Sequence, residues 1–155
     1  METATSMAGS RATLWMLWAA IVASLALDAI ALTRFLPVRA HPWYDAQTSV
    51  ALLVLGLLAL VAGVGTFALR ESLVLRDLRS GTLDPNTPSG FARIQRTLVA
   101  LWALCLVIGL FGDVLAWGAA KPIVATPFLI GAAVLLVVHA PRRWLFAHGA
   151  GAARA

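Results

Sequence analysis

Residues 46–69 read AQTSVALLVLGLLALVAGVGTFAL, a stretch of 24 residues without a single charged side chain. A helix that crosses the hydrocarbon core of a bilayer needs about 20 consecutive, mostly apolar residues, and this stretch meets that requirement. It is too long for a strand, and it lacks the alternation of apolar and polar residues that marks the strands of an outer-membrane barrel. The stretch therefore predicts a membrane-spanning α-helix.

Three further segments have the same apolar character. Over the apolar runs 12–33, 97–120 and 122–141, each contains one ionisable side chain, which is Asp28 in the first, Asp113 in the second and His139 in the last. The four spans are expected over residues 12–33, 46–69, 91–120 and 122–141. The sequence thus predicts an all-α chain in which residues 1–155 form a single integral membrane domain, folded as a four-helix bundle.

The composition excludes the other broad classes of protein. The residues AVILMFWYC make up 61% of the chain and charged residues 12%, whereas soluble domains are about 45–50% apolar and about 25% charged. Such a chain cannot cover a soluble surface, and it is far too apolar for a disordered segment. The single cysteine, Cys105, lies within a predicted span, so no intrachain disulfide can form and no thiolate metal site is expected.

Lysine and arginine are distributed unequally between the two sides that four spans define. The N-terminal tail, the middle loop and the C-terminal tail carry nine of them, against three in the other two loops. Because cytoplasmic segments carry the excess of positive charge, this distribution places both termini and the middle loop in the cytoplasm. Arginine outnumbers lysine 11 to 1, which is typical of GC-rich bacterial genomes. We therefore expect a multi-pass protein of the bacterial cytoplasmic (inner) membrane.

The first apolar segment also has to be compared with a secretory signal peptide. Ala29-Ile30-Ala31 resembles a small-residue cleavage site. However, the apolar run before it is longer than the roughly 7–15 residues of a signal peptide, and Asp28 directly precedes the site. We expect the first segment to be retained as a span.

The middle loop is expected to form a long cytoplasmic hairpin between the second and third helices. Residues 70–80 (RESLVLRDLRS) contain no proline or glycine, so the second helix should continue to Ser80 and end at Gly81 in the left-handed conformation. Thr87 should cap the next helix, with Pro88 in its first turn. Beside apolar spans, basic residues favour anionic lipid headgroups over nucleic acid. The arginines expected to contact headgroups or to dock a partner protein are Arg70, Arg76, Arg79, Arg93 and Arg96.

Glycines recur at helical spacing in the second and third spans. Small residues allow the backbones of membrane helices to approach closely. Gly56 and Gly63 share one face of the second span, and Gly109 and Gly112 lie on one face of the third. These four glycines are expected to be helix-packing positions inside the bundle.

Asp28 and Asp113 are the only acidic residues within the predicted spans. The first and third helices should run in the same direction, which places both carboxyl groups near the outer ends of their helices at matching depth. An ionisable residue costs roughly 2.5–3.5 kcal/mol at the centre of a span, so it usually faces the interior and has a partner. One interpretation is a shared proton or cation site, with Arg34 or Lys121 as counter-charge. The other is that both acids are hydrated near the interface and only balance an arginine.

No motif in the chain indicates an enzyme. The sequence has no glycine-rich phosphate loop after a strand, no Ser/His/Asp set and no HExxH motif. His139 has no second histidine at the spacing of a metal or haem site, and it is expected to be an interfacial histidine. Neither a metal nor another cofactor is expected.

Two functional classes fit these observations. The favoured one is an accessory, assembly or structural subunit that packs against another membrane protein or a second copy of itself. The alternative is a small oligomeric transporter or channel, coupled to protons or cations through Asp28 and Asp113. The two classes differ in whether the acids can be replaced by their amides without loss of function.

Overall fold

The computed structural model describes residues 2–36 and 47–142. Within this part of the chain the structure is helical, with no strand, and the prediction of an all-α chain is confirmed. Three helices are long and apolar enough to cross a membrane, over Arg11–Phe35, Ser49–Arg79 and Pro88–Ala119. Three of the arginines counted above, Arg39, Arg143 and Arg154, lie outside the described residues.

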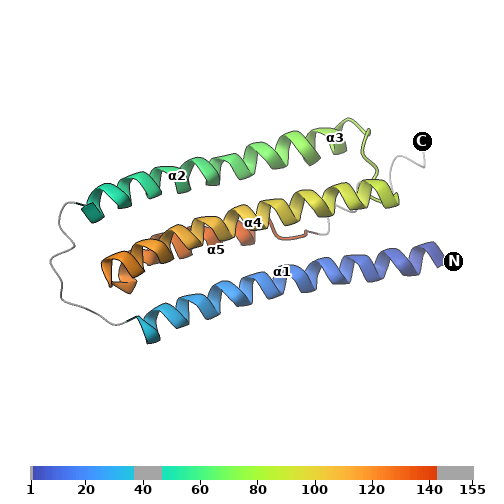
Figure 1. Cartoon of the computed structure of the whole chain (residues 1–155). Coiled ribbons are helices and arrows are strands. Elements are labelled where there is room, and N and C mark those ends of the chain that lie inside the picture. The colour runs from blue at the N-terminus through green and yellow to red at the C-terminus, as the bar shows by residue number, and fades with distance from the viewer. Residues whose placement is uncertain (1, 37–46, 143–155) are drawn as a thin grey trace.

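The helices form one elongated bundle. In chain order the elements are α1 (Glu2–Phe35), α2 (Gln47–Arg70), the π-helical turn η2 (Glu71–Leu75), α3 (Arg76–Arg79), α4 (Pro88–Ala119), the 3₁₀ turn η3 (Pro122–Ala125) and α5 (Thr126–Val138). α1 and α4 run in one direction, and α2 and α5 run in the opposite direction (Figure 1). The start of α1 and the α3–α4 loop therefore lie at the same end of the bundle, and α5 runs toward that end but stops short of it.

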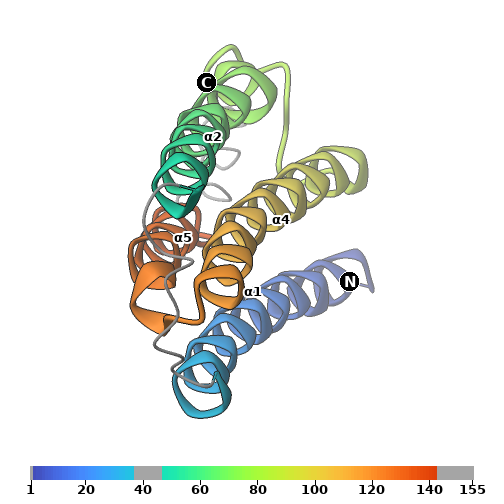
Figure 2. The ribbon, with the colours of Figure 1, turned by 60° about the vertical axis from the view of Figure 1, so that its left-hand side comes forward.

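α4 is the central helix of the bundle. It contacts α1, α2 and α5, and it lies between α1 on one side and the α2–α5 pair on the other (Figure 2). Ile94, Leu101, Trp102 and Cys105 of α4 are fully buried. α2, in contrast, exposes most of its apolar side chains, which is the pattern expected of a helix that faces lipid.

The hairpin between α2 and α4 has the predicted turns. The helix that begins with α2 continues through η2 and α3, and Gly81 follows it with a φ of +71°. Thr87 caps α4, because its Oγ1 accepts a hydrogen bond from the backbone N–H of Gly90 at 3.1 Å. The π-helical turn was not expected from the sequence, which contains no glycine or proline to mark it.

The fourth helix is shorter than predicted. Residues 122–141 were expected to form one span, but helical structure covers only residues 122–138 and begins with the 3₁₀ turn. At ~1.5 Å per residue this helix measures about 25 Å, which is less than the ~30 Å hydrocarbon core. Pro141 accounts for the early end, because a proline disfavours helical geometry at the residue before it. The bundle thus combines three long helices with one short helix.

Candidate functional site

The seam between α1 and α4 brings the two helices into close contact at two levels. At the first level, a Cβ atom on Gly109 would lie 3.1 Å from Leu25 Cδ1. At the second level, about two turns further along, Leu32 of α1 and Ala116 of α4 belong to one buried apolar cluster. Because the two helices are parallel, residues between these levels must also face one another across the seam.

Asp28 and Asp113 occupy the position between the two apolar levels. Their carboxyl groups lie close enough for the two side chains to interact with each other. The Oδ1 atom of Asp113 is buried, and no group in the described part of the chain forms a hydrogen bond with it. Carboxylate oxygens only accept hydrogen bonds, so a bond between two carboxyl groups requires a proton on one of them. The geometry therefore suits one shared proton, or one cation held by both acids.

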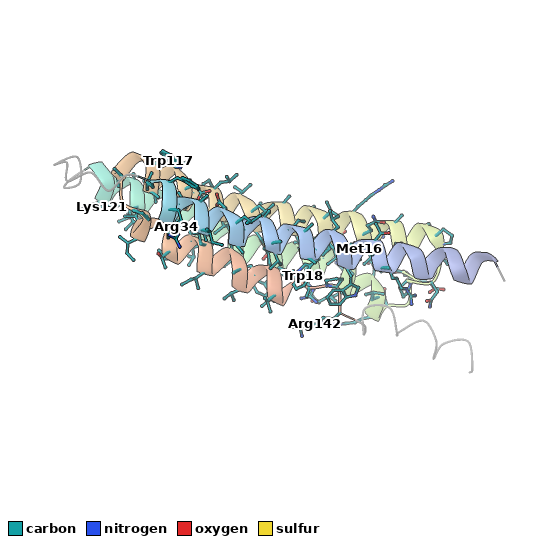
Figure 3. The ribbon with its side chains drawn as sticks, turned by 90° about the horizontal axis from the view of Figure 1, so that it is seen from below. Met16, Trp18, Arg34, Trp117, Lys121 and Arg142 are labelled. Carbon is teal, nitrogen blue, oxygen red and sulfur yellow. The ribbon has the colours of Figure 1, made fainter. Side chains whose placement is uncertain are left out.

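The two basic residues suggested as counter-charges lie further along the bundle. Arg34 is exposed, six residues beyond Asp28, and its Cα is therefore about 9 Å further along α1. Lys121 follows the end of α4. Figure 3 shows both residues at the same end of the bundle as Trp117. The structure thus brings the two acids together and places the two basic residues at a level nearer the end of the bundle.

The carboxyl pair is not part of a larger set of metal ligands. Among residues 2–36 and 47–142, no group of three or more His, Cys, Asp or Glu side chains is arranged to hold a metal ion. A transition-metal site generally needs at least three protein ligands, so the pair suits a proton or a weakly held monovalent cation better.

A second polar site lies around His139, which the sequence led us to expect at the membrane interface and which the structure buries within the protein. His139 is fully buried, and its Nε2 atom lies 2.9 Å from Thr66 Oγ1. The Thr66 hydroxyl donates its only proton to the carbonyl of Gly63 at 2.7 Å. His139 must then donate from Nε2, which leaves Nδ1 as a buried acceptor that no described group contacts by a hydrogen bond.

Side chains from the three other helices cap the end of α5. Trp18 of α1 donates to the Leu136 carbonyl at 3.0 Å, and Arg70 of α2 donates to the Val138 carbonyl at 3.2 Å. Trp102 of α4 donates to the carbonyl of His139 at 3.0 Å. The last carbonyls of a helix have no partners within the helix, and when they are buried in the protein they need donors from other segments. These donors explain how α5 can end at a level that the other helices pass.

The sequence did not predict this polar cap, which consists of Trp18, Arg70 and Trp102 around the end of α5. Its members belong to four segments that are distant in the sequence. The sequence holds one signal that points to it, namely that the fourth apolar segment ends in His139, Ala140 and Pro141, short of the length that a span requires. A helix that stops within the membrane needs donors, and the tryptophans near the same end are the available indole N–H groups.

The five hairpin arginines divide into three groups. Arg79 pairs with Glu71, and Arg93 pairs with Asp77 at 2.6 Å, so both contact acids of their own hairpin. Both pairs are solvent-exposed, and each should contribute no more than about 1 kcal/mol to stability. Arg70 belongs to the cap of α5. The remaining two, Arg76 and Arg96, are exposed at the surface of the hairpin.

The four glycines predicted to pack helices together fall into two pairs. Gly109 and Gly112 are buried where α4 meets α1, η3 and α5, and a Cβ atom on Gly112 would lie 2.8 Å from Phe128 Cβ. A Cβ on Gly56 would meet no atom within 4 Å, and one on Gly63 would make only an ordinary contact with Leu135. The expectation of close packing within the bundle is therefore wrong for Gly56 and Gly63, which line an open groove between α2 and α5.

Comparisons of the chain with protein-family models, with curated proteins and with solved structures find no match.

Proposed function

We propose that this chain is a non-enzymatic protein of the bacterial cytoplasmic membrane that binds a proton or small cation at Asp28 and Asp113, as a coupled transporter or channel in an oligomer. The observation that carries this proposal is the contact between the two carboxyl groups at one level of the α1–α4 seam. Both termini and the hairpin lie in the cytoplasm, as the excess of positive charge at that end favours.

The energetic cost of the pair supports a functional role. An acid in a span is costly, and two acids in contact add their mutual repulsion. Apolar levels lie on both sides of the pair along the seam, at Leu25 and at Leu32. A pair of alanines or leucines would fill the same positions without either penalty, so the stability of the bundle gives no reason for the acids. Binding of a proton or cation does give one.

Proton movement into liposomes that contain the purified chain tests this proposal. A membrane potential is imposed, and a pH-sensitive dye inside the vesicles reports proton entry. We expect wild-type vesicles to acidify faster than empty ones, and Asp28→Asn and Asp113→Asn to abolish the difference. Asp84→Asn is the matched control, because Asp84 is an exposed acid whose Oδ1 accepts a bond from the Asn86 N–H, which an amide oxygen can also accept. Unchanged acidification by both span variants would contradict the proposal.

A second candidate function is that of an accessory or assembly subunit, and the structure of the hairpin favours it. Leu83 and Pro85 of the α3–α4 loop are buried, and a Cβ on Gly90 would collide with the Asp84 carbonyl oxygen. Arg11 of α1 donates a hydrogen bond to the Asn86 side chain at 3.1 Å. The loop is therefore held in one shape, as a preformed docking surface for another membrane protein or a second copy would be.

Affinity purification in mild detergent separates the two candidates. If the chain is an accessory subunit, a partner chain should co-purify with the wild type and with both Asp→Asn variants. Substitution of the exposed hairpin arginines, Arg76→Gln with Arg96→Gln, should release it. A preparation that contains only this chain, under conditions in which proton movement is observed, would exclude the accessory role.

A further inference from the structure

An apolar groove lies between α2 and α5. Its volume is about 630 Å³, and it is lined along α2 from Leu52 to Phe67 and along α5 from Pro127 to Leu135. Fifteen residues separate Leu52 from Phe67, so the groove extends for about 22 Å along the helix. That length exceeds the ~15 Å that one leaflet contributes to the hydrocarbon core. The groove is therefore long enough for one acyl chain.

Two arginines lie at one end of this groove. Arg70 follows the lining residue Phe67 by one helical turn, and its Nη1 donates to the Val138 carbonyl, across the gap from α2 to α5. Arg142 follows Val138 by four residues and is close enough to Arg70 for the two positive charges to repel each other. Figure 3 shows Arg142 at about the same level along the bundle as Trp18 of α1.

The other charges near this end do not cancel the two arginines. Glu71 attracts the neighbouring Arg70, but its carboxylate also pairs with Arg79, so this one acid is shared between two arginines. The end of α5 carries partial negative charge, but its carbonyls already accept bonds from Trp18, Trp102 and Arg70. A net positive site thus adjoins an apolar groove, and two like charges in proximity are stabilised by an anion between them.

We infer that one anionic phospholipid binds here, with its phosphate between Arg70 and Arg142 and one acyl chain in the groove between α2 and α5. Basic pockets between helices on the cytoplasmic side of membrane proteins are recognised sites for anionic headgroups. The chemistry of the site favours a lipid over a helix from a second protein. A helix in this groove would have to supply an acid at the level of the arginines, whereas a phospholipid supplies the charge and the chain together.

Native mass spectrometry of the delipidated full chain tests the inference. The probes are phosphatidylglycerol, phosphatidylcholine with the same acyl chains, and glycerol phosphate, which has the charge without the chains. We expect one phosphatidylglycerol to remain bound per chain and neither other probe to be retained at the same concentration. Arg142→Gln should weaken retention about fivefold, the order expected for one arginine at an anionic surface. Arg76→Gln, which removes an exposed arginine of the hairpin, is the control and should have no such effect.

A substitution inside the groove tests the position of the chain independently. Gly56 lines the groove and Gly65 does not, and a Cβ on either would meet no atom within 4 Å, so leucine at both positions should fold. Gly56→Leu should reduce phosphatidylglycerol binding, whereas Gly65→Leu should leave it unchanged.

Three results would overturn the inference. They are equal retention of the two phospholipids, equal effects of the variants and their controls, and a lipid-free dimer that Gly56→Leu dissociates. The last result would assign the groove to a second copy of the chain. Melting temperatures of all variants in detergent distinguish loss of lipid from loss of fold.

Discussion

Replacement of Gly112 by alanine should destabilise the bundle, although alanine is the better helix former. A Cβ atom at this position would lie 2.8 Å from Phe128 Cβ, 3.0 Å from the Ala125 carbonyl oxygen and 3.2 Å from Ala125 Cα. Two of these atoms belong to the backbone of η3, so a rotamer change cannot relieve the contact and α4 must separate from η3. Overpacking of this kind costs about 1–3 kcal/mol, and the helix propensity of alanine returns up to about 1 kcal/mol.

The net loss should therefore be about 1–2 kcal/mol, which for a chain of this size lowers the melting temperature by about 2–8 °C. Thermal unfolding in detergent, followed by circular dichroism, measures the change. Gly65→Ala is the matched control, since the same Cβ at that position meets no atom within 4 Å and its melting temperature should equal or exceed that of the wild type. A Gly112→Ala variant that melts at or above the wild-type temperature would refute the close approach of α4 and η3.

Two further experiments test the polar cap and the topology. Trp102→Phe should lower the free energy of unfolding by about 1–3 kcal/mol in thermal unfolding, because it leaves the buried carbonyl of His139 without its donor. Trp117→Phe, at an exposed position, is the control and should change the free energy of unfolding by less than about 0.5 kcal/mol. In a Cys105→Ala background, a membrane-impermeant maleimide should label His41→Cys but not Asn86→Cys in intact cells, because the proposed topology places the hairpin in the cytoplasm. Labelling of Asn86→Cys with protection of His41→Cys would invert the topology.

The existence and direction of the helices could be predicted because they depend on local properties of the sequence. An uncharged run such as residues 46–69 specifies a long apolar helix without reference to the rest of the chain. The helix ends at Gly81 and Thr87 were equally accessible, since caps depend on a few neighbouring residues. Because α1 and α4 are the first and third long helices, they must run in the same direction. That direction places Asp28 and Asp113 at matching levels along the bundle.

The features that could not be predicted depend on contacts between distant segments. Glycines at helical spacing show that another helix can approach the backbone, but they do not show whether one does. Gly112 and Gly56 therefore look alike in the sequence, whereas in the structure only Gly112 has a close neighbour. His139 was assigned to the interface from its place near the end of an apolar run. Its burial depends on Thr66, 73 residues away, and on Trp102, 37 residues away, whose indole N–H binds its carbonyl.

The capped end of α5 has a consequence for how the protein is made. α5 follows the three long helices in the chain and is synthesised after them, yet its carbonyls are the acceptors for indoles in the first and third long helices. Chains grow at about 5–20 residues per second, so the three long helices enter the bilayer seconds before the segment that joins them is complete. We therefore expect a nascent chain arrested before residue 122 to remain a loosely associated intermediate that membrane proteases degrade. Synthesis of residues 122–139 would then be the step that commits the described helices to their native packing.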